Sequence, residues 1–460
     1  MRQNKMKQIS IDFSKTTHAP KMINGVNNGP ICNQNVVNLS SRYREMNIPS
    51  VRLHDTDGAN SRFYVDVSRI FPHFDADEND PGNYYFQHTD HLIKSIDALG
   101  AEVVYRLGES IDHDIEGRYA RPPRDFDKWC RIAVNIIRHY NDGWADGYHY
   151  NIRCWEIWNE GEGINEHGIR CNWRGGDVPQ LFDLYRRASR AIRDYDPTLL
   201  VGGMAFCSLN EAMEQFVGFC REEDLPLDFL SYHGYESTYA DVYGHAVRVR
   251  ELLDRFGFNG TKVWFDEWNY IGFEHPWEGD IWMMIRNDET PELRAEVHTN
   301  QKNEVGGSFA AAALIALNDG PCDKAHYYDG QIASNWCGLF DSYSIPQKPF
   351  YTFCAYGQMY SACTQMVAVD NSTMQPPYAM AAVGEGVGMI LLSNYRGEAG
   401  HIALDMSSLG RGMKKAEIFR IGKTQNLELE RVEYYTAETV TQIVYAEPYE
   451  VVFVRITTTD

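Results

Sequence analysis

Residues 154–163 read Cys154-Trp155-Glu156-Ile157-Trp158-Asn159-Glu160-Gly161-Glu162-Gly163. The run that ends at Trp158 is rich in β-branched and aromatic residues and has the length of one buried strand, and glycines then interrupt it. Glu160 is therefore predicted at the carboxyl end of a strand. In a barrel of parallel strands, active sites lie at that end. A loop glutamate is as often only a solvated carboxylate, so this stretch alone leaves both interpretations open.

Strands and helices alternate on both sides of this stretch. Short strands are predicted near residues 24, 51, 103, 155, 200, 229, 263 and 326, and each leads into a helical segment. The helical segments are residues 33–47, 91–99, 125–140, 178–195, 210–223, 242–256, 292–317 and 350–363. Eight such units are typical of a (β/α)8 TIM barrel, an α/β fold built on a parallel sheet.

The sequence pattern changes after residue 365, where alternating segments with turn residues between them replace the helices. These segments predict an accessory C-terminal β-sandwich. We expect a catalytic barrel over residues 19–364 and a sandwich domain over residues 365–460. Residues 1–18 contain an N-terminal strand that we expect to join the sandwich.

The composition excludes several classes of partner. The chain has 43 basic and 64 acidic residues and a formal net charge of −21, which argues against nucleic acid or an anionic membrane surface as a partner. No signal-peptide core follows the basic N-terminal residues, and no later run is long enough to cross a bilayer. The ten cysteines include no CxxC pair, which predicts reduced thiols in a cytoplasmic protein. The sequence leaves a homo-oligomer open.

A second acidic residue follows another predicted strand. The strand near residue 263 ends in Phe265-Asp266-Glu267-Trp268-Asn269. Glu160 and Glu267 are therefore expected to enter the same cup at the top of the barrel. Two facing carboxylates are what glycoside hydrolysis needs, because one protonates the leaving oxygen while the other attacks the anomeric carbon or activates water.

These two motifs resemble known families. The segment from Trp155 to Glu160 resembles the acid/base strand of glycoside hydrolase family 39, in the (β/α)8 superfamily called clan A, and the segment from Phe265 to Asn269 resembles the nucleophile strand of family 51. The resemblance implies that Glu160 is the general acid/base and Glu267 the nucleophile of a retaining, double-displacement mechanism. The chain departs from family 39 at Gly161, where the family usually has proline.

The same resemblance assigns supporting residues. Arg52 is similar to the clan's strand-2 arginine, which keeps the nucleophile ionised, although an ordinary salt bridge would also explain it. Asn159 is similar to the amide that binds the sugar's 2-hydroxyl, and His233 and Tyr235 are similar to a His and a Tyr near the nucleophile. The remaining candidates for substrate binding are His54 and Asp55, after the second strand, and Trp336, in the loop after the eighth strand.

No motif for a metal site or for a nucleotide or flavin cofactor is present, so we expect no metal and no cofactor. The favoured function is a retaining exo-glycosidase acting on a small oligosaccharide or glycoside, with β-xylosidase as the first substrate class. An α-L-arabinofuranosidase is the alternative within clan A. A barrel that only binds carbohydrate is the alternative outside the enzymes.

Overall fold

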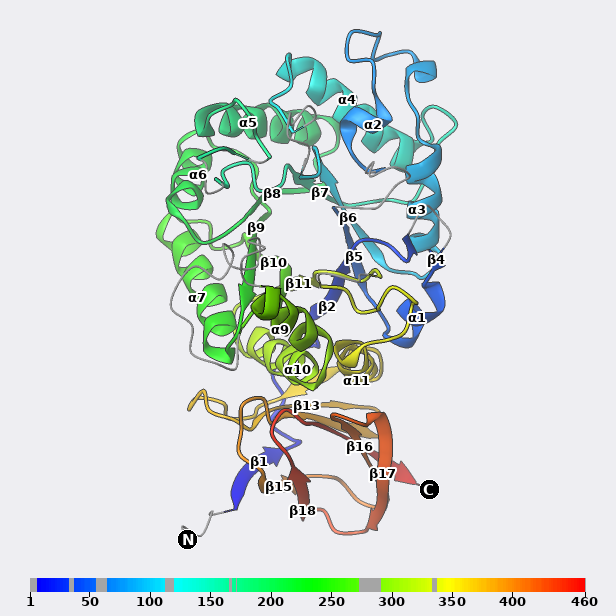
Figure 1. The fold of residues 1–460 in the computed structure, drawn as a ribbon, viewed down its shortest axis with the longest axis vertical. Helices are drawn as coiled ribbons and strands as arrows, with labels where there is room; N and C mark the ends of the chain where they lie inside the picture. Colours follow the sequence, from blue (N-terminus) through cyan, green and yellow to red (C-terminus); the bar gives the residue numbers. More distant parts are fainter. Residues whose placement is uncertain are drawn as a thin grey trace.

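The computed structural model describes residues 6–32, 37–54, 64–111, 120–164, 168–170, 172–272, 291–332 and 337–459. Within these ranges eight parallel strands close into a barrel, in the order β10-β11-β2-β5-β6-β7-β8-β9 around the ring (Figure 1). They are β2 (Met22–Asn27), β5 (Ser50–Leu53), β6 (Glu102–Leu107), β7 (Cys154–Ile157), β8 (Leu200–Phe206), β9 (Phe229–Glu236), β10 (Lys262–Tyr270) and β11 (Lys324–Tyr327). The predicted (β/α)8 barrel is confirmed.

Helices surround the barrel and connect its strands. They are α1 (Ser40–Glu45), α2 (Val67–Ile70), α3 (Gln87–Asp97), α4 (Phe126–Asp142), α5 (Val178–Tyr195), α6 (Glu211–Glu222), α7 (Tyr239–Arg255), α9 (Pro291–Lys302), α10 (Glu304–Asp319) and α11 (Lys348–Ala362), with a 3-10 turn η1 (Pro81–Asn83). Two short strands, β3 (Ile31–Cys32) and β4 (Val37–Asn38), pair with each other before α1.

The structure differs from the sequence-based expectation in two helical segments. In the described part of the segment 33–47, the helix begins at Ser40, because Val37 and Asn38 pair with β3 as strand β4. The segment 292–317 is two helices that meet at Asn303. The side chain of Asn303 accepts a hydrogen bond from the backbone N–H of Val305 at 2.9 Å, so it caps α10 and separates it from α9.

Helix α4, which precedes β7, has clear signals at both ends. Asp125 accepts a hydrogen bond from the backbone N–H of Lys128 at 3.0 Å, as expected from its position before the helix. Gly143 ends the helix in the left-handed region, with φ of 76°. The helix that follows β7, α5, begins with Asp177 and Gln180 capping each other's backbone. These caps fix the two helices that flank the central strand.

The N-terminal strand β1 and the strands that follow residue 364 form two facing sheets. The larger sheet has the order β12-β13-β14-β19-β16-β17 and the smaller one the order β1-β15-β18. Their strands are β1 (Lys7–Asp12), β12 (Gln365–Val367), β13 (Tyr378–Gly384), β14 (Val387–Ser393), β15 (Gly400–Ser407), β16 (Met413–Ile421), β17 (Asn426–Tyr435), β18 (Val440–Ala446) and β19 (Val451–Thr459). Buried apolar side chains from both sheets form one core, which confirms the β-sandwich. Strand β1 pairs in parallel with β15.

Helices α10 and α11 lie between the barrel and the sandwich (Figure 1). Residues 305–318 of α10 are all buried, because its faces pack on β10, on α7 and α11, and on strands β13 and β14. The hydroxyl of Ser393 donates a hydrogen bond to the carbonyl of Ser308 at 2.7 Å across this junction. A helix that is apolar on all sides is a core helix. The two units therefore share a packed interface.

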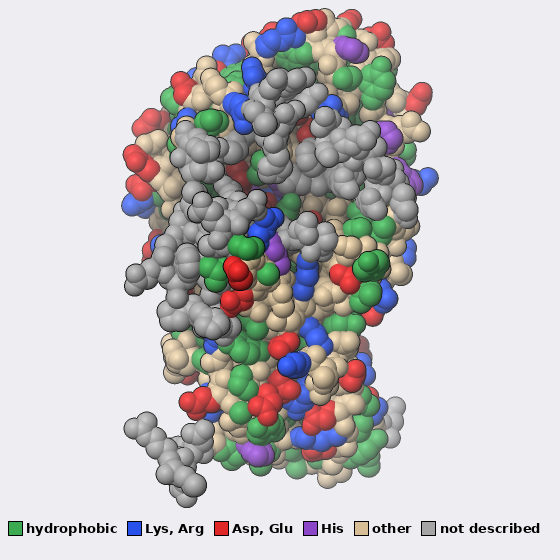
Figure 2. Space-filling model, viewed as in Figure 1, with side chains coloured by type: hydrophobic (Ala, Val, Ile, Leu, Met, Phe, Trp, Pro, Cys, Tyr) green, Lys and Arg blue, Asp and Glu red, His purple; other side chains and the backbone are tan. Residues whose placement is uncertain are grey.

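The distribution of charged side chains on the surface and the state of the cysteines can be compared with the predictions made from composition. Figure 2 shows acidic and basic side chains mixed over the visible face of both units rather than gathered into one basic stripe. In the part of the chain that the structure describes, no helix is both long and apolar enough to span a bilayer. The cysteines that lie in the described ranges are free thiols, and all of them except Cys207 are buried.

The close packing of β8 against β9 leaves no space for a side chain at Gly202. A Cβ atom at this position in β8 would lie 2.1 Å from the carbonyl oxygen of Phe229 in β9. Overpacking of this kind costs about 1 to 3 kcal/mol, so Gly202→Ala should lower the free energy of unfolding by about that amount. Gly400→Ala in β15 is the matched control, because nothing lies within 4 Å of a Cβ there. Denaturant unfolding of both variants checks this, and equal stability would contradict it.

Candidate active site

The interior of the barrel begins with an apolar floor. The rings of Phe229 and Trp264 stack at a centroid distance of 3.7 Å, and Val104 and Cys154 are buried beside them. Successive side chains of a strand point to opposite faces, so the residues two positions further along, such as Glu156 after Cys154, also point inward. A layer of charged side chains therefore lies directly above an apolar floor.

Arg52, near the end of β5, is the centre of that charged layer and is fully buried. Its Nε donates to Glu156 Oε2 at 2.7 Å, and its Nη1 and Nη2 donate to Asn27 Oδ1 at 2.9 Å and Asn159 Oδ1 at 2.7 Å. Its contact with Glu267 is longer, 3.5 Å from Nη1 to Oε2. Burial would lower the pKa of Arg52, but the surrounding acids outweigh it and hold that pKa above its usual range.

A β-bulge places two consecutive acids on the inner face of β10. Phe265 is opposite Tyr232 in β9 and Glu267 is opposite His233, so Asp266 is an extra residue in the ladder. In a regular strand, Asp266 and Glu267 would point to opposite faces of the sheet. Here both approach Arg52, at 3.0 Å for Asp266 and 3.5 Å for Glu267. A bulge re-aims side chains in this way at many active sites.

Glu160 follows β7 in a tight, constrained loop. Trp158 and Glu160 have φ of 66° and 48°, in the left-handed region that non-glycine residues rarely adopt. The backbone N–H of Glu160 donates to the carbonyl of Ala205 at 3.0 Å, which holds the loop against the end of β8. A Cβ atom at Gly161 would lie 2.7 Å from Leu181 of α5. This close approach explains why a glycine follows the glutamate.

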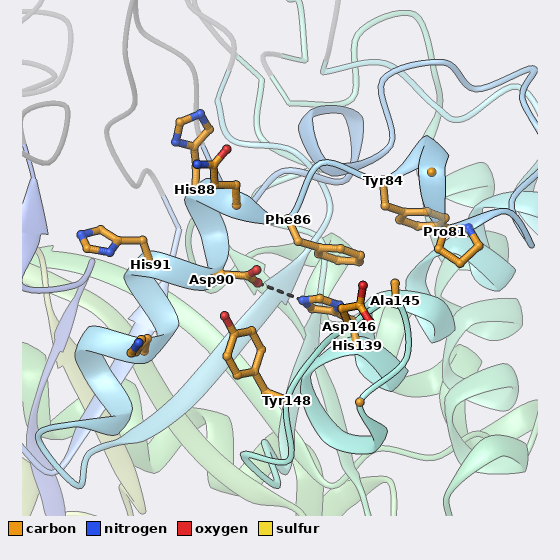
Figure 3. A pocket seen from close by; sticks show the side chains of 14 residues that line it. Pro81, Tyr84, Phe86, His88, Asp90, His91, His139, Ala145, Asp146 and Tyr148 are labelled. Atoms are coloured by element: carbon orange, nitrogen blue, oxygen red, sulfur yellow. Dashed lines mark hydrogen bonds and ion pairs between the residues drawn. The ribbon is translucent and has the colours of Figure 1, made fainter.

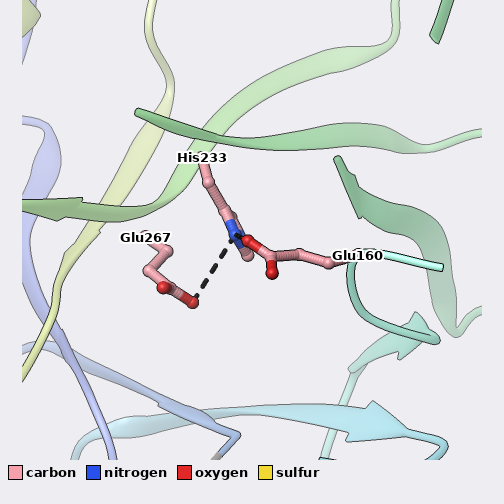
Figure 4. Close-up of side chains that lie close together, drawn as sticks. All are labelled: Glu160, His233 and Glu267. Carbon is pink, nitrogen blue, oxygen red and sulfur yellow. Dashed lines mark hydrogen bonds and ion pairs between the residues drawn. The ribbon is translucent and has the colours of Figure 1, made fainter. Parts of the chain in front are cut away.

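The two glutamates meet at His233 (Figure 4). His233 Nδ1 lies 2.6 Å from Glu160 Oε1 and 3.6 Å from Glu267 Oε2. The hydroxyl of Tyr235 donates to Glu267 Oε1 at 2.5 Å. One oxygen of each glutamate and one His233 nitrogen all lie within 4.8 Å of one another. Four of the predicted site residues therefore form one contiguous group.

Glu267 is in an electrostatic balance. Burial raises the pKa of Glu267 to about 7, and the neighbouring charge of Glu160 acts in the same direction. His233, Arg52 and the Tyr235 hydroxyl lower that pKa, because each stabilises the ionised carboxylate. Without these three groups, Glu267 would be a neutral acid over a wider pH range.

Asn159 is oriented by Arg52. Its Oδ1 accepts from the guanidinium, so its Nδ2 faces the other way, and this buried amide nitrogen has no hydrogen-bond partner within the described ranges. A buried donor without a partner is costly, and a ligand at this position would satisfy it. The amide is thus available to an acceptor that enters the site.

The other predicted residues have different outcomes. His54 is buried after β5, where its carbonyl accepts from Arg106 and Ser110 at 3.2 Å. Asp55 and Trp336 lie outside the described residues. Sequence analysis did not single out Glu156, Asp266 or Asn27 as site residues. The available signal was a charged residue inside an apolar strand, which occurs at Glu156 and at Asp266.

A separate cavity of about 1150 Å³ lies outside the barrel, between α3 and the loop after α4 (Figure 3). Its inner polar groups are already engaged with one another. His139 lies 2.9 Å from both Asp90 Oδ1 and the carbonyl of Trp144, and its ring stacks on Phe86 at 3.5 Å. These contacts are those of a packed structural histidine. We therefore assign the chemistry to the interior of the barrel.

Glu160, His233 and Glu267 also have a geometry that could hold a metal ion. The contacts around them favour another use. Glu267 already accepts a hydrogen bond from Tyr235 and faces the guanidinium of Arg52, which would repel a second cation. The arrangement suits proton transfer between paired carboxyl groups.

The chain matches a known protein family over part of its length. The family model for Glycosyl hydrolases family 39 matches residues 83–282. The resemblance to family 39 drawn from the sequence is confirmed. A β-xylosidase from Geobacillus stearothermophilus is 34% identical over 119 residues, which is 25% of this chain and 22% of that protein. The chain thus matches only about a fifth of the length of this curated relative.

Solved structures are similar to the whole chain in fold. A glucosidase from Croceicoccus marinus matches with a TM-score of 0.80 and 20% identity, over 99% of both chains. A monomeric β-xylosidase from Caulobacter crescentus CB15 matches with a TM-score of 0.74 and 14% identity, over 99% of this chain and 100% of that one. The combination of barrel and sandwich is therefore shared with these proteins.

The balance at Glu267 predicts measurable pKa shifts. In a carbon-13 NMR titration, the Glu267 carboxyl should titrate near 7. Glu160→Gln should lower this pKa by removing a negative charge, and Tyr235→Phe should raise it by removing a donor to the carboxylate. The carboxyl signal that titrates near 7 should be absent from the spectrum of Glu267→Gln, which would assign it to Glu267. If the Glu267 carboxyl of the parent chain titrated at the ordinary glutamate pKa, the expected effect of burial on this group would be wrong.

Proposed function

We propose that the chain is a retaining exo-glycosidase, with β-xylosides as the first substrate class. The observation that supports this is the approach of the two glutamates, with one oxygen of each within 4.8 Å. Retaining enzymes hold their carboxyl groups about 5 to 5.5 Å apart, whereas inverting enzymes leave about 6.5 to 9.5 Å for a water molecule. A separation within 4.8 Å supports the retaining mechanism, because an inverting enzyme needs a longer one.

The environments of the two glutamates support different roles. Glu267 is 9% exposed, and Tyr235 and Arg52 stabilise its ionised form, as a nucleophile requires. Glu160 is 20% exposed and lies on the loop after β7. An acid/base must exchange protons with a leaving group and then with water, so the more exposed glutamate suits that role.

The proposed reaction has two steps. Glu267 attacks the anomeric carbon while Glu160 donates its proton to the glycosidic oxygen, which leaves as an alcohol. Glu160, now ionised, removes a proton from water, and that water displaces Glu267 from the sugar. Asn159 Nδ2, held outward by Arg52, would donate to the sugar's 2-hydroxyl during both steps.

The sugar and linkage are chosen from the relatives and the motifs. Two β-xylosidases and a glucosidase are among the similar proteins. The segment from Phe265 to Asn269 keeps α-L-arabinofuranosides as the second candidate. A panel of nitrophenyl glycosides, assayed with the purified chain, tests both. Sugar binding without hydrolysis of any member would instead favour a carbohydrate-binding barrel.

The cellular setting also belongs to the proposal. The free thiols of the described cysteines fit the cytoplasmic location predicted from the sequence. A cytoplasmic enzyme would meet imported short oligosaccharides. It should then hydrolyse these faster than polymers, and rapid mid-chain cutting of an insoluble polysaccharide would contradict this.

Rescue by azide distinguishes the proposed roles of Glu160 and Glu267. Glu267→Ala should abolish turnover, because no glycosyl-enzyme can form. Glu160→Ala should still form that intermediate from a nitrophenyl glycoside, whose leaving group needs little acid assistance. Azide should then rescue this variant and give a glycosyl azide with the anomeric configuration of the substrate. Product analysis by NMR checks the assignment.

Glu162→Gln is the control for the azide experiment, since this neighbouring buried glutamate has no role in the proposed steps and should show no azide dependence. Azide acting on Glu267→Ala would occupy the nucleophile's cavity and give the inverted product. The opposite pattern of products would exchange the two roles. Unchanged hydrolysis in both alanine variants would place the active site elsewhere.

A further inference from the structure

Two fully buried carboxyl groups, those of Glu156 and Asp266, lie beneath the paired glutamates. Arg52 Nε is 2.7 Å from Glu156 Oε2 and 3.0 Å from Asp266 Oδ2. This nitrogen has a single hydrogen, which it donates to Glu156. Among the residues that the structure describes, neither oxygen of Asp266 accepts a hydrogen bond from an N–H or O–H group. An ionised Asp266 would thus be a buried anion without a donor.

The charges around Asp266 come from every neighbouring strand. They are Arg52 on β5, Glu156 on β7, His233 on β9 and Glu267 on β10 itself. His326 on β11 is a further titratable group, close to Arg52 and Glu156. Burial holds the pKa of His326 well below its ordinary value, so that ring is neutral. His233 Nε2 is 3.6 Å from Asp266 Oδ1, beyond hydrogen-bond length, and its Nδ1 faces Glu160.

Arg52 therefore has too little charge for all the acids. It contacts three carboxyl groups within 3.5 Å, those of Glu156, Asp266 and Glu267. An uncompensated charge inside a protein is strongly destabilising. When Glu267 is ionised for nucleophilic attack, one of the two lower acids must be protonated.

The hydrogen bonds decide which acid has the proton. Arg52 Nε lies 2.7 Å from Glu156 Oε2 and 3.0 Å from Asp266 Oδ2, so the two carboxyl groups are neighbours, and a hydrogen bond between them would need one proton. Burial would raise the pKa of Glu156, but Arg52 and the donors around it bring that pKa down to about 2. Burial and the charge of Glu156 hold the pKa of Asp266 well above its ordinary value.

We propose that Asp266 is a positioning residue that stays protonated and donates this hydrogen to Glu156, so that Arg52 is shared by two carboxylates instead of three. The proton anchors Glu156, which in turn orients Arg52 toward Asn159 and Glu267. Asp266 therefore adds no negative charge next to the nucleophile. The inference depends on the proposed function only for the role of Glu267.

The test compares two isosteric variants by the pH dependence of kcat/KM on a nitrophenyl glycoside. Asp266→Asn replaces a neutral donor with a neutral donor, so the acidic limb, which reports ionisation of Glu267, should stay at the pH of the parent chain. Glu156→Gln is the matched control, because it removes a real negative charge near Arg52 and should move that limb to lower pH. Asp266→Ala removes the donor and should lower kcat/KM. Asp266→Asn keeps a donor at this position, so its kcat/KM should be higher than that of Asp266→Ala.

A shift of the limb to lower pH in Asp266→Asn, comparable with that of Glu156→Gln, would overturn the proposal, because it would show that Asp266 is ionised. A measurement on the parent chain covers the case in which a variant does not fold. In a carbon-13 NMR spectrum of the chain labelled in its aspartate carboxyl groups, one signal should have the chemical shift of a protonated carboxyl group at neutral pH. The loss of this signal in Asp266→Asn would assign it to Asp266. Ionisation of all aspartates at neutral pH would overturn the proposal. This readout needs no substrate, so a chain that hydrolyses no glycoside but keeps the signal would refute only the proposed function.

Discussion

The candidate site depends on one buried cation. Arg52 has no exposed surface. From β5, its guanidinium contacts Asn27 of β2, Glu156 of β7 and Glu267 of β10. A buried charge is tolerated only when hydrogen-bonded partners compensate it. The strands that supply those partners are therefore fixed relative to each other by the same contacts that orient the reactive groups. Removing Arg52 would leave several acids facing one another in a region that water does not reach.

Packing and chemistry depend on each other at the end of β10. The apolar floor of Phe229 and Trp264 offers the acids above it no polar partner, so those acids contact each other, Arg52, His233 and a few hydroxyl and amide groups. The bulge at Asp266 brings one more acid into this layer than a regular strand would allow. Burial then raises the pKa of Glu267, and Arg52, His233 and Tyr235 oppose that shift. A carboxyl group whose pKa lies near neutral results from this opposition.

The sequence predicted what depends on local pattern. All eight strands followed from short apolar runs, and Glu160 and Glu267 followed from acids at the ends of two of them. The roles of Glu156 and Asp266 depend on the closure of the barrel and on a register shift between β9 and β10, which join residues far apart in the sequence. No local pattern contains that information. The split at Asn303 was missed for a different reason, since helical periodicity continues across it and only its side-chain cap marks the break.

The strained loop after β7 shows why a precise site needs support from a distance. Trp158 and Glu160 adopt left-handed backbone conformations, which persist only when the surroundings enforce them. The indole of Trp158 donates to the carbonyl of Asn172 at 2.7 Å, and its ring packs edge-on against Trp173 at 4.8 Å. Leu181 of α5 closes the space over Gly161. The position of Glu160 is therefore set by contacts on the outer side of the barrel, whereas the position of Glu267 is set by Arg52 and Tyr235 inside it. His233 is the contact that the two glutamates share, so their separation follows from the packing of α5 against the barrel as well as from the polar cluster between them.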